Sequence, residues 1–241
     1  SAPDGYTLLM GSTSSLSVIP NLQKVPYDPI KDFTPVSLVA YIPHVLVINN
    51  DVPAKTLAQF IAYAKANPGK LSYASSGNGT PHQIAVEMFK KMSGVFIVHI
   101  PYRGTAPGLT DLMSGQVALM SVELSSALPF IKAQKIRPLA LLAPTRSTFA
   151  PDIPTAAQAG LPGLDITSWY GVVAPAGINR ETLNTLGTAI AKAVKSPDLN
   201  VKILGMGATP VGDTPEEFNV FMRKESAKWA KAIKESGAVA D

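Results

Sequence analysis

Short apolar runs alternate along most of the chain with segments whose apolar residues recur at helical spacing. This alternation is typical of βα units and therefore predicts a mixed α/β fold. The ranges predicted as strands are 5–10, 36–48, 71–75, 95–100, 117–122, 137–142 and 166–174. The ranges predicted as helices are 14–22, 56–66, 81–93, 106–114, 125–133, 154–159, 180–195, 197–204 and 215–236.

Residue types at the ends of these segments support several boundaries. Threonine is a preferred N-cap, and we expect Thr56, Thr80 and Thr214 to cap the helices that follow them. Pro81 directly after Thr80 is typical of a first helical position. Gly94 follows the segment 81–93, as glycine commonly does where a helix ends.

Two extended segments suggest how the chain is divided. A lobe that is entered near 42–45 and left near 167–171 is bounded by two crossing strands, as a hinged discontinuous domain requires. We therefore predict a first lobe made of 1–43 and 169–241, and a second lobe made of 44–168. The Pro-rich stretch 144–163 is interpreted as a surface excursion and not as a linker.

Composition excludes several classes of protein. Hydrophobic residues make up 46% of the 241 positions, which is enough for a core and argues against disorder. No apolar run approaches the roughly 18 residues that a membrane span needs. Lys and Arg are spread along the chain, so the net charge of +4 does not indicate nucleic-acid binding. The absence of Cys and the unhelpful spacing of the three His predict no metal and no cofactor.

The segment 73–82 (YASSGNGTPH) carries the strongest local signal for binding. A strand ends there in a loop of small residues that opens a helix at Pro81. Gly77 and Gly79 allow close approach of a ligand to the backbone, and a helix N-terminus attracts anions. The residues alone leave two interpretations open, namely a carboxylate site or an ordinary tight βα turn.

A second strand, loop and helix follow at 99–107 (HIPYRGTAP). In a parallel sheet both loops would lie at the same strand ends, where α/β proteins bind ligands. Arg103 is able to pair with a carboxylate, although an Arg in such a loop more often makes a surface ion pair.

Other chemistries fit less well. The chain lacks a P-loop and the third glycine of a dinucleotide fingerprint, and 11–15 (GSTSS) is not a nucleophile elbow. His82 is in principle a general base but is expected to be a hydrogen-bonding group at the helix start. Glu123 ends a predicted strand, where it is either a solvated residue or a hydrogen-bond acceptor in a cleft. Trp169 and Tyr170 either wall a pocket or fill the core, and core is slightly favoured.

Taken in order, several short motifs resemble the Bug/TctC family, the solute receptors of tripartite tricarboxylate transporters. The resemblance covers essentially the whole chain, and the order and spacing of the motifs make it specific. The matching motifs are PDGYTLL at 3–9, VPYDP at 25–29, KDF at 31–33, AKANPGKLSYASSG at 64–77, IPYRGTAP at 100–107, DIPT at 152–155, WYG at 169–171, APAG at 174–177 and PEEF at 215–218.

This resemblance implies a type II-like periplasmic binding protein fold, with two α/β lobes joined by crossing hinge strands and the solute held between them. It implies capture of a small carboxylic acid without catalysis, delivery to the membrane components of such a transporter, and a periplasmic location. We expect a monomer. The ligand-binding residues that it implies are Ser12, Thr13, Ser76, Gly77, Asn78, Gly79, Thr80, His82, Gly104, Thr105, Ala106, Glu123, Trp169 and Tyr170.

The chain departs from the family at its start. Relative to the family pattern, an N-terminal strand, a helix and a carboxylate-binding loop have no counterpart, so we expect an unpaired sheet edge in the first lobe. One alternative is therefore a truncated receptor whose binding is impaired. A second alternative, from another class, is a hydrolase that uses Ser and His82.

Overall fold

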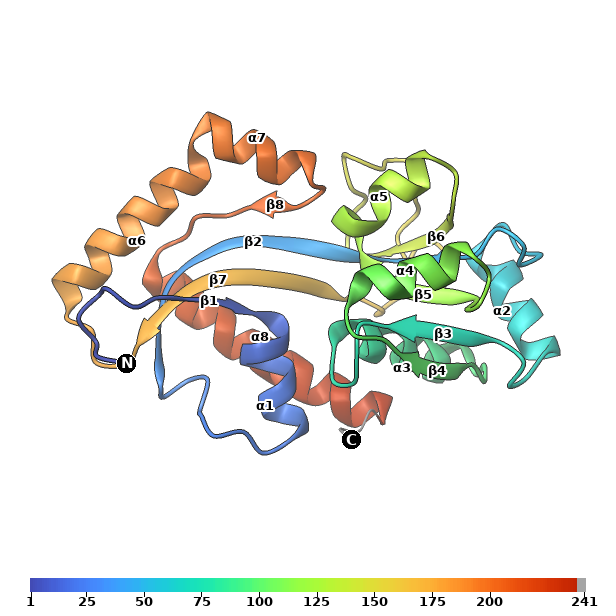
Figure 1. Ribbon diagram of the computed structural model, residues 1–241, viewed down its shortest axis with the longest axis horizontal. Helices are drawn as coiled ribbons and strands as arrows, with labels where there is room; N and C mark the ends of the chain where they lie inside the picture. The colour runs from blue at the N-terminus through green and yellow to red at the C-terminus, as the bar shows by residue number, and fades with distance from the viewer. Residues whose placement is uncertain (238–241) are drawn as a thin grey trace. The chain divides into compact units, whose positions relative to one another are not determined.

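The computed structural model describes residues 1–237 and divides into two compact units (Figure 1). Unit 1 consists of Ser1–Ile42 and Ser168–Lys234, and unit 2 of Pro43–Thr167 with Glu235–Asp241, of which 238–241 lie outside the described residues. The chain passes between the units within β2 (Phe33–Ile48) and at the start of β7 (Thr167–Pro175). The lobes expected from the sequence differ from these units by one residue at each of these two passages. They also assign 235–241 to the first lobe, whereas the division places Glu235–Asp241 with unit 2.

Unit 1 is built on a sheet in which β7 lies between β1 (Leu9–Ser12) and β2, while the short strand β8 (Thr209–Pro210) pairs with β2. β1 runs antiparallel to β7, with Met10 opposite Val172. The helical elements of this unit are η1 (Ser14–Val18), α1 (Ile19–Leu22), α6 (Arg180–Lys195), α7 (Pro197–Gly205) and α8 (Pro215–Ser236).

Alternate residues of β7 serve two hydrophobic cores, because successive side chains of a strand point to opposite faces. Trp169 and Val173 pack with Phe218 and Met222 of α8. Val172 and Ala174 instead pack with partly buried residues of α6. Accordingly, Figure 1 shows α8 and α6 on opposite sides of these strands.

Gly171 explains how closely α8 approaches the sheet. A Cβ atom at this position would lie 2.1–2.9 Å from three ring atoms of Phe218. Real Cβ atoms do not come this close, so a larger side chain would push the Phe218 ring out of the core.

The outer edge of unit 1 is the strand β1, which has no second neighbour among residues 1–237. Its apolar side chains are exposed, including Leu9 at 43% and Met10 at 56%. The expected unpaired edge is therefore present in the described part of the chain. The strand predicted at 5–10 starts later, at Leu9, because Gly5 adopts a φ of +86° and only 9–12 pair with β7.

Unit 2 has a second sheet, in the order β6 (Arg137–Leu142), β2, β5 (Leu119–Glu123), β3 (Ser72–Ser75) and β4 (Val98–Pro101). The strands β3, β4 and β5 are parallel, whereas β2 runs antiparallel to β5 and β6. The helices of this unit are α2 (Leu57–Ala66), α3 (Pro81–Ser93), α4 (Thr105–Met113) and α5 (Leu124–Lys132).

The two faces of this sheet are covered by different helices. Leu109 and Leu112 of α4 and Leu124 and Leu128 of α5 share a core with Val45 of β2. On the other face, Phe60 of α2 stacks on Phe89 of α3 with ring centroids 6.1 Å apart. All four helices were predicted from the sequence, because their apolar residues recur every three or four positions.

Most predicted elements are present, and the exceptions have local causes. The helix predicted at 154–159 is wrong. Leu141 of β6 donates to Pro154 O and accepts from Ala156 N, which draws this segment into a bridge followed by one turn. The helix predicted at 14–22 is a π-helical turn followed by one α-helical turn, and β8 was not predicted.

Candidate functional site

The carboxyl ends of three parallel strands meet at one edge of the unit 2 sheet. The pairs Ser75 with Pro101 and Ala74 with Met120 fix the register of β3 against β4 and of β3 against β5. Each strand is followed by a loop or a direct turn into a helix, namely α3, α4 and α5. The edge at which both predicted loops were expected to lie together is therefore present, and Glu123 at the end of β5 joins them.

The loop 76–80 is held by its own hydrogen bonds. Ser75 Oγ accepts from Gly77 N at 3.2 Å and donates to Gly77 O at 3.1 Å, while Thr80 Oγ1 donates to Gly77 O at 2.7 Å. Gly79 N donates to Gln83 Oε1 at 2.7 Å. Gly77 and Gly79 have φ values of +131° and +68°, which only glycine adopts readily. The loop is thus fixed by internal bonds that occupy the N–H groups of both glycines.

A second set of bonds joins this loop to the next one. Tyr102 N donates to Ser75 O at 3.0 Å, and Gly104 N donates to Ser76 O at 3.2 Å. Gly104 has a φ of +107° and is the N-cap of α4. The loops after β3 and β4 therefore form one continuous backbone surface.

No side chain among residues 1–237 caps the helix starts at this edge. Thr80 is the N-cap residue of α3, but its hydroxyl donates to Gly77 O and accepts from no helix N–H, so the capping role expected for it is wrong. Gly104 has no side chain to cap α4, and Glu123 makes no capping bond to α5. By contrast, Thr56 caps α2 by accepting from Gln59 N. Within residues 1–237, three helix N-termini that no side chain caps therefore converge at one edge of unit 2.

A polar cluster surrounds His82 in the first turn of α3. Its Nε2 lies 2.9 Å from Glu123 Oε2 and 3.4 Å from Thr105 Oγ1. Its Nδ1 lies 2.8 Å from Ser76 Oγ. The imidazole therefore links all three elements that meet at this edge: the loop after β3, the start of α4 and the end of β5.

A second histidine approaches Glu123 from β2. His44 stands directly opposite Glu123 in the β2–β5 pairing, with its Nε2 3.9 Å from Glu123 Oε1 and its Nδ1 3.2 Å from Ser121 Oγ. The rings of His44 and His82 meet edge to face, with centroids 5.0 Å apart. Both side chains are buried, so the cluster is shielded from bulk water.

Burial and charge move the pKa values of this cluster in a consistent way. Burial raises the pKa of the Glu123 carboxyl, but attraction to His82 and His44 and the His82 hydrogen bond outweigh it, so the pKa lies well below its usual range. Burial lowers the pKa of His44 to about 3, and attraction to Glu123 offsets this only in part. Near neutral pH, Glu123 is therefore an anion and His44 is a neutral hydrogen-bonding group.

The candidates in unit 1 have different surroundings. Thr13 is buried, with its Oγ1 accepting from Trp169 N at 2.6 Å. The Trp169 side chain is fully buried and meets the rings of Phe218 and Phe221 edge to face, which places it in a core. Ser12 pairs with Ser15 through both hydroxyls.

Three further candidates are more accessible. Tyr170 is 37% exposed, and Ala106 is exposed at the second position of α4. Asn78 is partly buried between Gly77 and Gly79. Arg103, expected more often than not to form a surface ion pair, is exposed and makes no ion pair with any residue in 1–237, so that expectation is wrong.

Three residues of the cluster were not found by sequence reasoning. His44 and Ser121 complete the surroundings of Glu123, and Ser75 holds the loop 76–80. A usable signal was present for His44, because an ionisable residue directly before the apolar run 45–48 has to be buried with a partner. Ser121 lies two positions before Glu123 and therefore points to the same face of β5.

The arrangement limits the chemistry that is possible at this edge. Ser76, His82 and Glu123 are in contact in the order of a serine, histidine and acid catalytic triad. Such a triad also needs N–H donors that form an oxyanion hole, but the N–H groups of Gly77 and Gly79 are already engaged in hydrogen bonds within the protein. Within 1–237 no group of three or more acidic, His or Cys side chains is suited to hold a metal ion, and no helix is long and apolar enough to cross a membrane.

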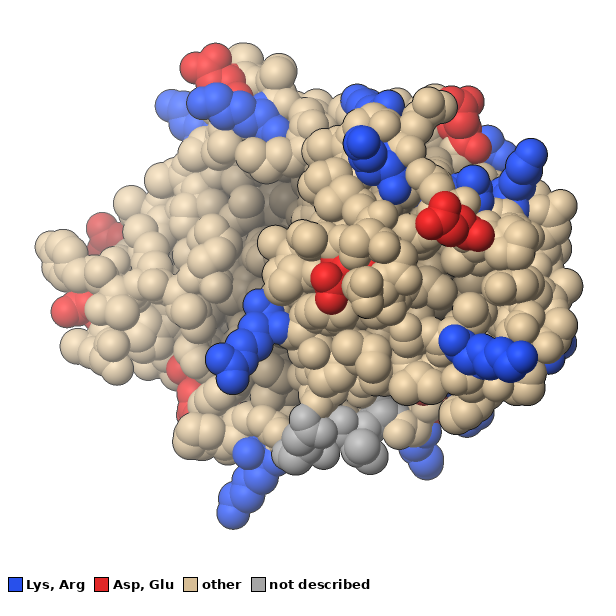
Figure 2. Space-filling model, turned by 45° about the vertical axis from the view of Figure 1, so that its right-hand side comes forward, with Lys and Arg blue, Asp and Glu red and all other residues tan. Residues whose placement is uncertain are grey.

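Charge on the surface is dispersed. Figure 2 shows Lys, Arg, Asp and Glu scattered over the visible face, with no single-sign stripe. A continuous basic track of the kind that binds nucleic acid is absent from that face.

Comparisons with known proteins agree with one another. The model of a family described as "Tripartite tricarboxylate transporter family receptor" (TctC) matches residues 1–238. BugT of Bordetella pertussis is 35% identical over 99% of this chain and 74% of its own length. An R. palustris protein solved with adipate has a TM-score of 0.93 at 35% identity, covering 99% of this chain and 80% of that one. MatC from Rhodopseudomonas palustris, solved with bound malate, has a TM-score of 0.87 at 30% identity, covering 97% and 81%.

Proposed function

The chain belongs to the family of tripartite tricarboxylate transporter receptors, and from this premise we propose that it captures a small carboxylic acid at the strand-end edge of unit 2 and does not convert it. Members of this family are periplasmic solute-binding proteins, and the relatives solved with adipate and with malate bind carboxylates.

The observation that carries the proposal is the convergence of three helix starts without side-chain caps. N–H groups that no side chain caps are available to an acceptor from outside, and a carboxylate supplies two oxygen atoms with a negative charge that the helix dipoles favour. The Glu123 carboxylate at the same edge would repel such a ligand if it stood alone. His82 Nε2, 2.9 Å from Glu123 Oε2, occupies one of the two carboxylate oxygens and so turns it away from the solute.

We assign distinct roles to the residues at this edge. Thr105 and Ala106 offer the first N–H groups of α4, and the hydroxyls of Ser76 and Thr105 donate further hydrogen bonds to the solute. His82 holds the Glu123 carboxylate and the Ser76 hydroxyl in position through contacts of 2.9 and 2.8 Å. The loop residues Gly77, Asn78, Gly79 and Thr80, together with Gly104, provide a rigid backbone wall. Solute contacts by Ser12 and Tyr170 of unit 1 are part of the same proposal and rest on the family resemblance alone. Thr13 and Trp169, which the resemblance also implies, are buried and are not assigned a solute contact.

The finer aspects of the function follow from the family and are proposed with it. These are a periplasmic location for this chain, the membrane components of a tripartite tricarboxylate transporter as partners, a monomeric receptor, and the absence of catalysis.

The experiment is a thermal-shift and calorimetric screen at fixed pH and ionic strength. Mono-, di- and tricarboxylates are compared with neutral amides and sugars, and the recovered solute is analysed for chemical change. A ligand at about a hundred times its dissociation constant adds roughly 2.7 kcal/mol of stability, a clear rise in melting temperature. Saturable binding of one acid, recovered intact, supports the proposal. No response to any acid would contradict it and favour a receptor fragment that does not bind.

A hydrolase is the second candidate, because Ser76, His82 and Glu123 are joined by contacts of 2.8 and 2.9 Å. A serine-directed phosphonate probe decides between the two. Labelling of Ser76 that is lost in His82→Ala supports a hydrolase, whereas the absence of labelling eliminates it.

A further inference from the structure

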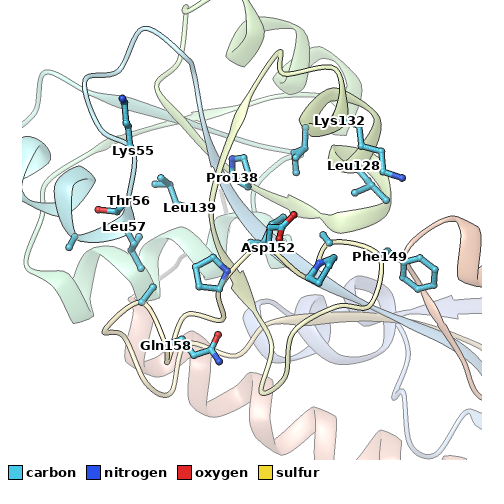
Figure 3. Close-up of a pocket in the computed structure, with 17 residues that line it drawn as sticks. Lys55, Thr56, Leu57, Leu128, Lys132, Pro138, Leu139, Phe149, Asp152 and Gln158 are labelled. Atoms are coloured by element: carbon cyan, nitrogen blue, oxygen red, sulfur yellow. The ribbon is translucent and has the colours of Figure 1, made fainter.

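Unit 2 contains a cavity of about 710 Å³ that the strand-end site does not use (Figure 3). Its floor is apolar and well buried, with contributions from Leu57, Leu128, Leu139 and Ile153. None of the residues proposed for carboxylate binding lines it. A cavity of this size is within the range of about 300–1,000 Å³ that small-molecule sites occupy.

The walls come from four segments that are distant in sequence and held in place. They are the start of α2, the end of α5, the first residues of β6 and the loop 149–159. Arg146 fixes that loop, with its Nε donating to Gln158 Oε1 at 2.8 Å and a terminal nitrogen donating to Pro151 O at 2.7 Å. Prolines at 138, 151 and 154 add stiff surface to the walls. The cavity is therefore preformed and does not depend on a mobile side chain.

Charged side chains at the rim have an excess of positive charge. Lys55 and Lys132 are exposed, line the cavity and make no ion pair or hydrogen bond through their ammonium groups within the described chain. Figure 3 shows them on two sides of Pro138, from different elements. Asp152 also lines the cavity and is the only acid that does so among the described residues, which leaves one net positive charge.

We propose that this cavity is a second ligand site, for an amphipathic monocarboxylate with an apolar body of medium length. The body would lie on the leucine and isoleucine floor, where burial of each methylene contributes about 0.8 kcal/mol. The carboxylate would stay at the rim beside Lys55 and Lys132. A dicarboxylate fits this site poorly, because its second charge would have to enter the apolar floor.

The β2–β6 pairing separates this cavity from the strand-end site. Pro138 stands opposite Val47, while Leu142 at the other end of β6 stands opposite His44. Val47 lies three positions after His44 along β2, and at about 3.3 Å per residue this is roughly 10 Å. The inference therefore stands independently of the proposed function.

The test uses octanoate as the probe and isothermal titration calorimetry on the whole chain. Octanoate should bind the wild type saturably, octanamide should bind more weakly, and a saturating dicarboxylate should not displace octanoate. Simultaneous Lys55→Glu and Lys132→Glu substitutions reverse both rim charges at exposed positions. They should lower the octanoate affinity at least about tenfold, because each new carboxylate repels the ligand head group.

The matched control is the pair Lys65→Glu and Lys135→Glu. Lys65 lies on α2 and Lys135 follows α5, both are exposed, and neither lines the cavity, so the net charge changes equally without touching the rim. Unchanged affinity in this control is the expected result. Equal loss in both pairs, no loss in the rim pair, absence of saturable octanoate binding, or displacement of octanoate by a dicarboxylate would each overturn the inference.

The same variants separate this inference from the proposed function. Dicarboxylate binding is measured on the rim pair in parallel. If octanoate binding fails while dicarboxylate binding persists, only the second site is refuted. If dicarboxylate binding fails in the wild type while octanoate behaves as described, the strand-end proposal fails alone.

Discussion

The starts of α2 and α4, both in unit 2, differ in whether a side chain caps their first N–H groups. At α2, Thr56 Oγ1 accepts from Gln59 N, and Gln59 Oε1 accepts from Lys55 N in return. At α4, the N-cap is Gly104, and no side chain returns a bond. The second helical residue is an exposed alanine in both, Ala58 in α2 and Ala106 in α4.

The difference suggests that the start of α2 has a structural role, whereas the start of α4 is available to bind a ligand. A capped N-terminus has used part of its donor capacity within the protein, whereas an uncapped one keeps it for an acceptor from outside. At the second cavity beside α2, the anion is therefore expected to be held by lysines and not by the helix start.

The largest expected effect comes from placing the same charge at both starts. Ala106→Asp puts a carboxylate about 5 Å from the proposed solute, where repulsion at an effective dielectric of about 20 is roughly 3 kcal/mol. The dicarboxylate affinity should fall about a hundredfold by calorimetry. Ala58→Asp is the matched control, because it adds the same charge at the same helical position and should leave dicarboxylate affinity unchanged.

Both substitutions place an acid in a first helical turn, which stabilises a helix slightly, so unfolding does not confuse the comparison. The amphipathic probe should show the reverse preference, with weaker octanoate binding in Ala58→Asp only. Equal loss of dicarboxylate affinity in the two variants would mean that general electrostatics, and not the α4 start, holds the solute.

A smaller effect concerns pH, since the buried His44 titrates and a threonine cap does not. The pKa of His44 is about 3 when folded, below its ordinary value of 6.5. Between these values the unfolded chain binds the proton and the folded chain does not. Stability contributed by neutral His44 is thus present above pH 6.5 and is lost as pH falls, by at most about 1.4 kcal/mol per unit.

Urea unfolding at pH 7 and at pH 5 measures this loss. His44→Gln should remove most of the difference between the two pH values, while Thr56→Ala should lower stability equally at both. The burial account of His44 would fail if His44→Gln retained the full pH dependence of the wild type.

The smallest expected effects distinguish the role of Thr56, a helix cap, from that of Thr80, which holds the loop 76–80. Thr56→Ala removes a cap and should cost about 1 kcal/mol in the free energy of unfolding, with no change in dicarboxylate affinity. Thr80→Ala removes the bond to Gly77 O and should weaken dicarboxylate binding several-fold, about 0.5–1.5 kcal/mol, with Thr80→Ser restoring it. Equal binding by Thr80→Ala and the wild type would remove the loop 76–80 from the site.

The sequence predicted the strand-end edge well because its determinants are local. A strand, a glycine-bearing loop and a proline at or near a helix start are all visible within ten residues, and parallel pairing then brings such loops together. The hydrogen bond that the Thr80 hydroxyl makes could not be predicted in this way. A threonine before Pro81 has the composition of a cap, but its hydroxyl bonds back to Gly77, a choice set by the fold of the loop.

Long-range contacts set the remaining limits. His44 reaches Glu123 across 79 positions only because β2 and β5 pair in one register. Trp169 packs on Phe218 because Gly171 lets α8 approach. The second cavity is built from four separated segments. Only one of them carries a recognised motif, DIPT at 152–155, and that motif does not reveal which other segments lie beside it.

The most direct test of the central claim is a titration of isotope-labelled protein with a dicarboxylate, followed by the backbone amide signals of the helix starts. Carboxylate binding at the strand-end edge should give saturable shifts at His82, Thr105 and Ala106, with the capped start of α2 at Ala58 and Gln59 unchanged. Saturable shifts at the α2 start without any at the starts of α3 and α4 would contradict the claim that a carboxylate is held at the strand-end edge of unit 2.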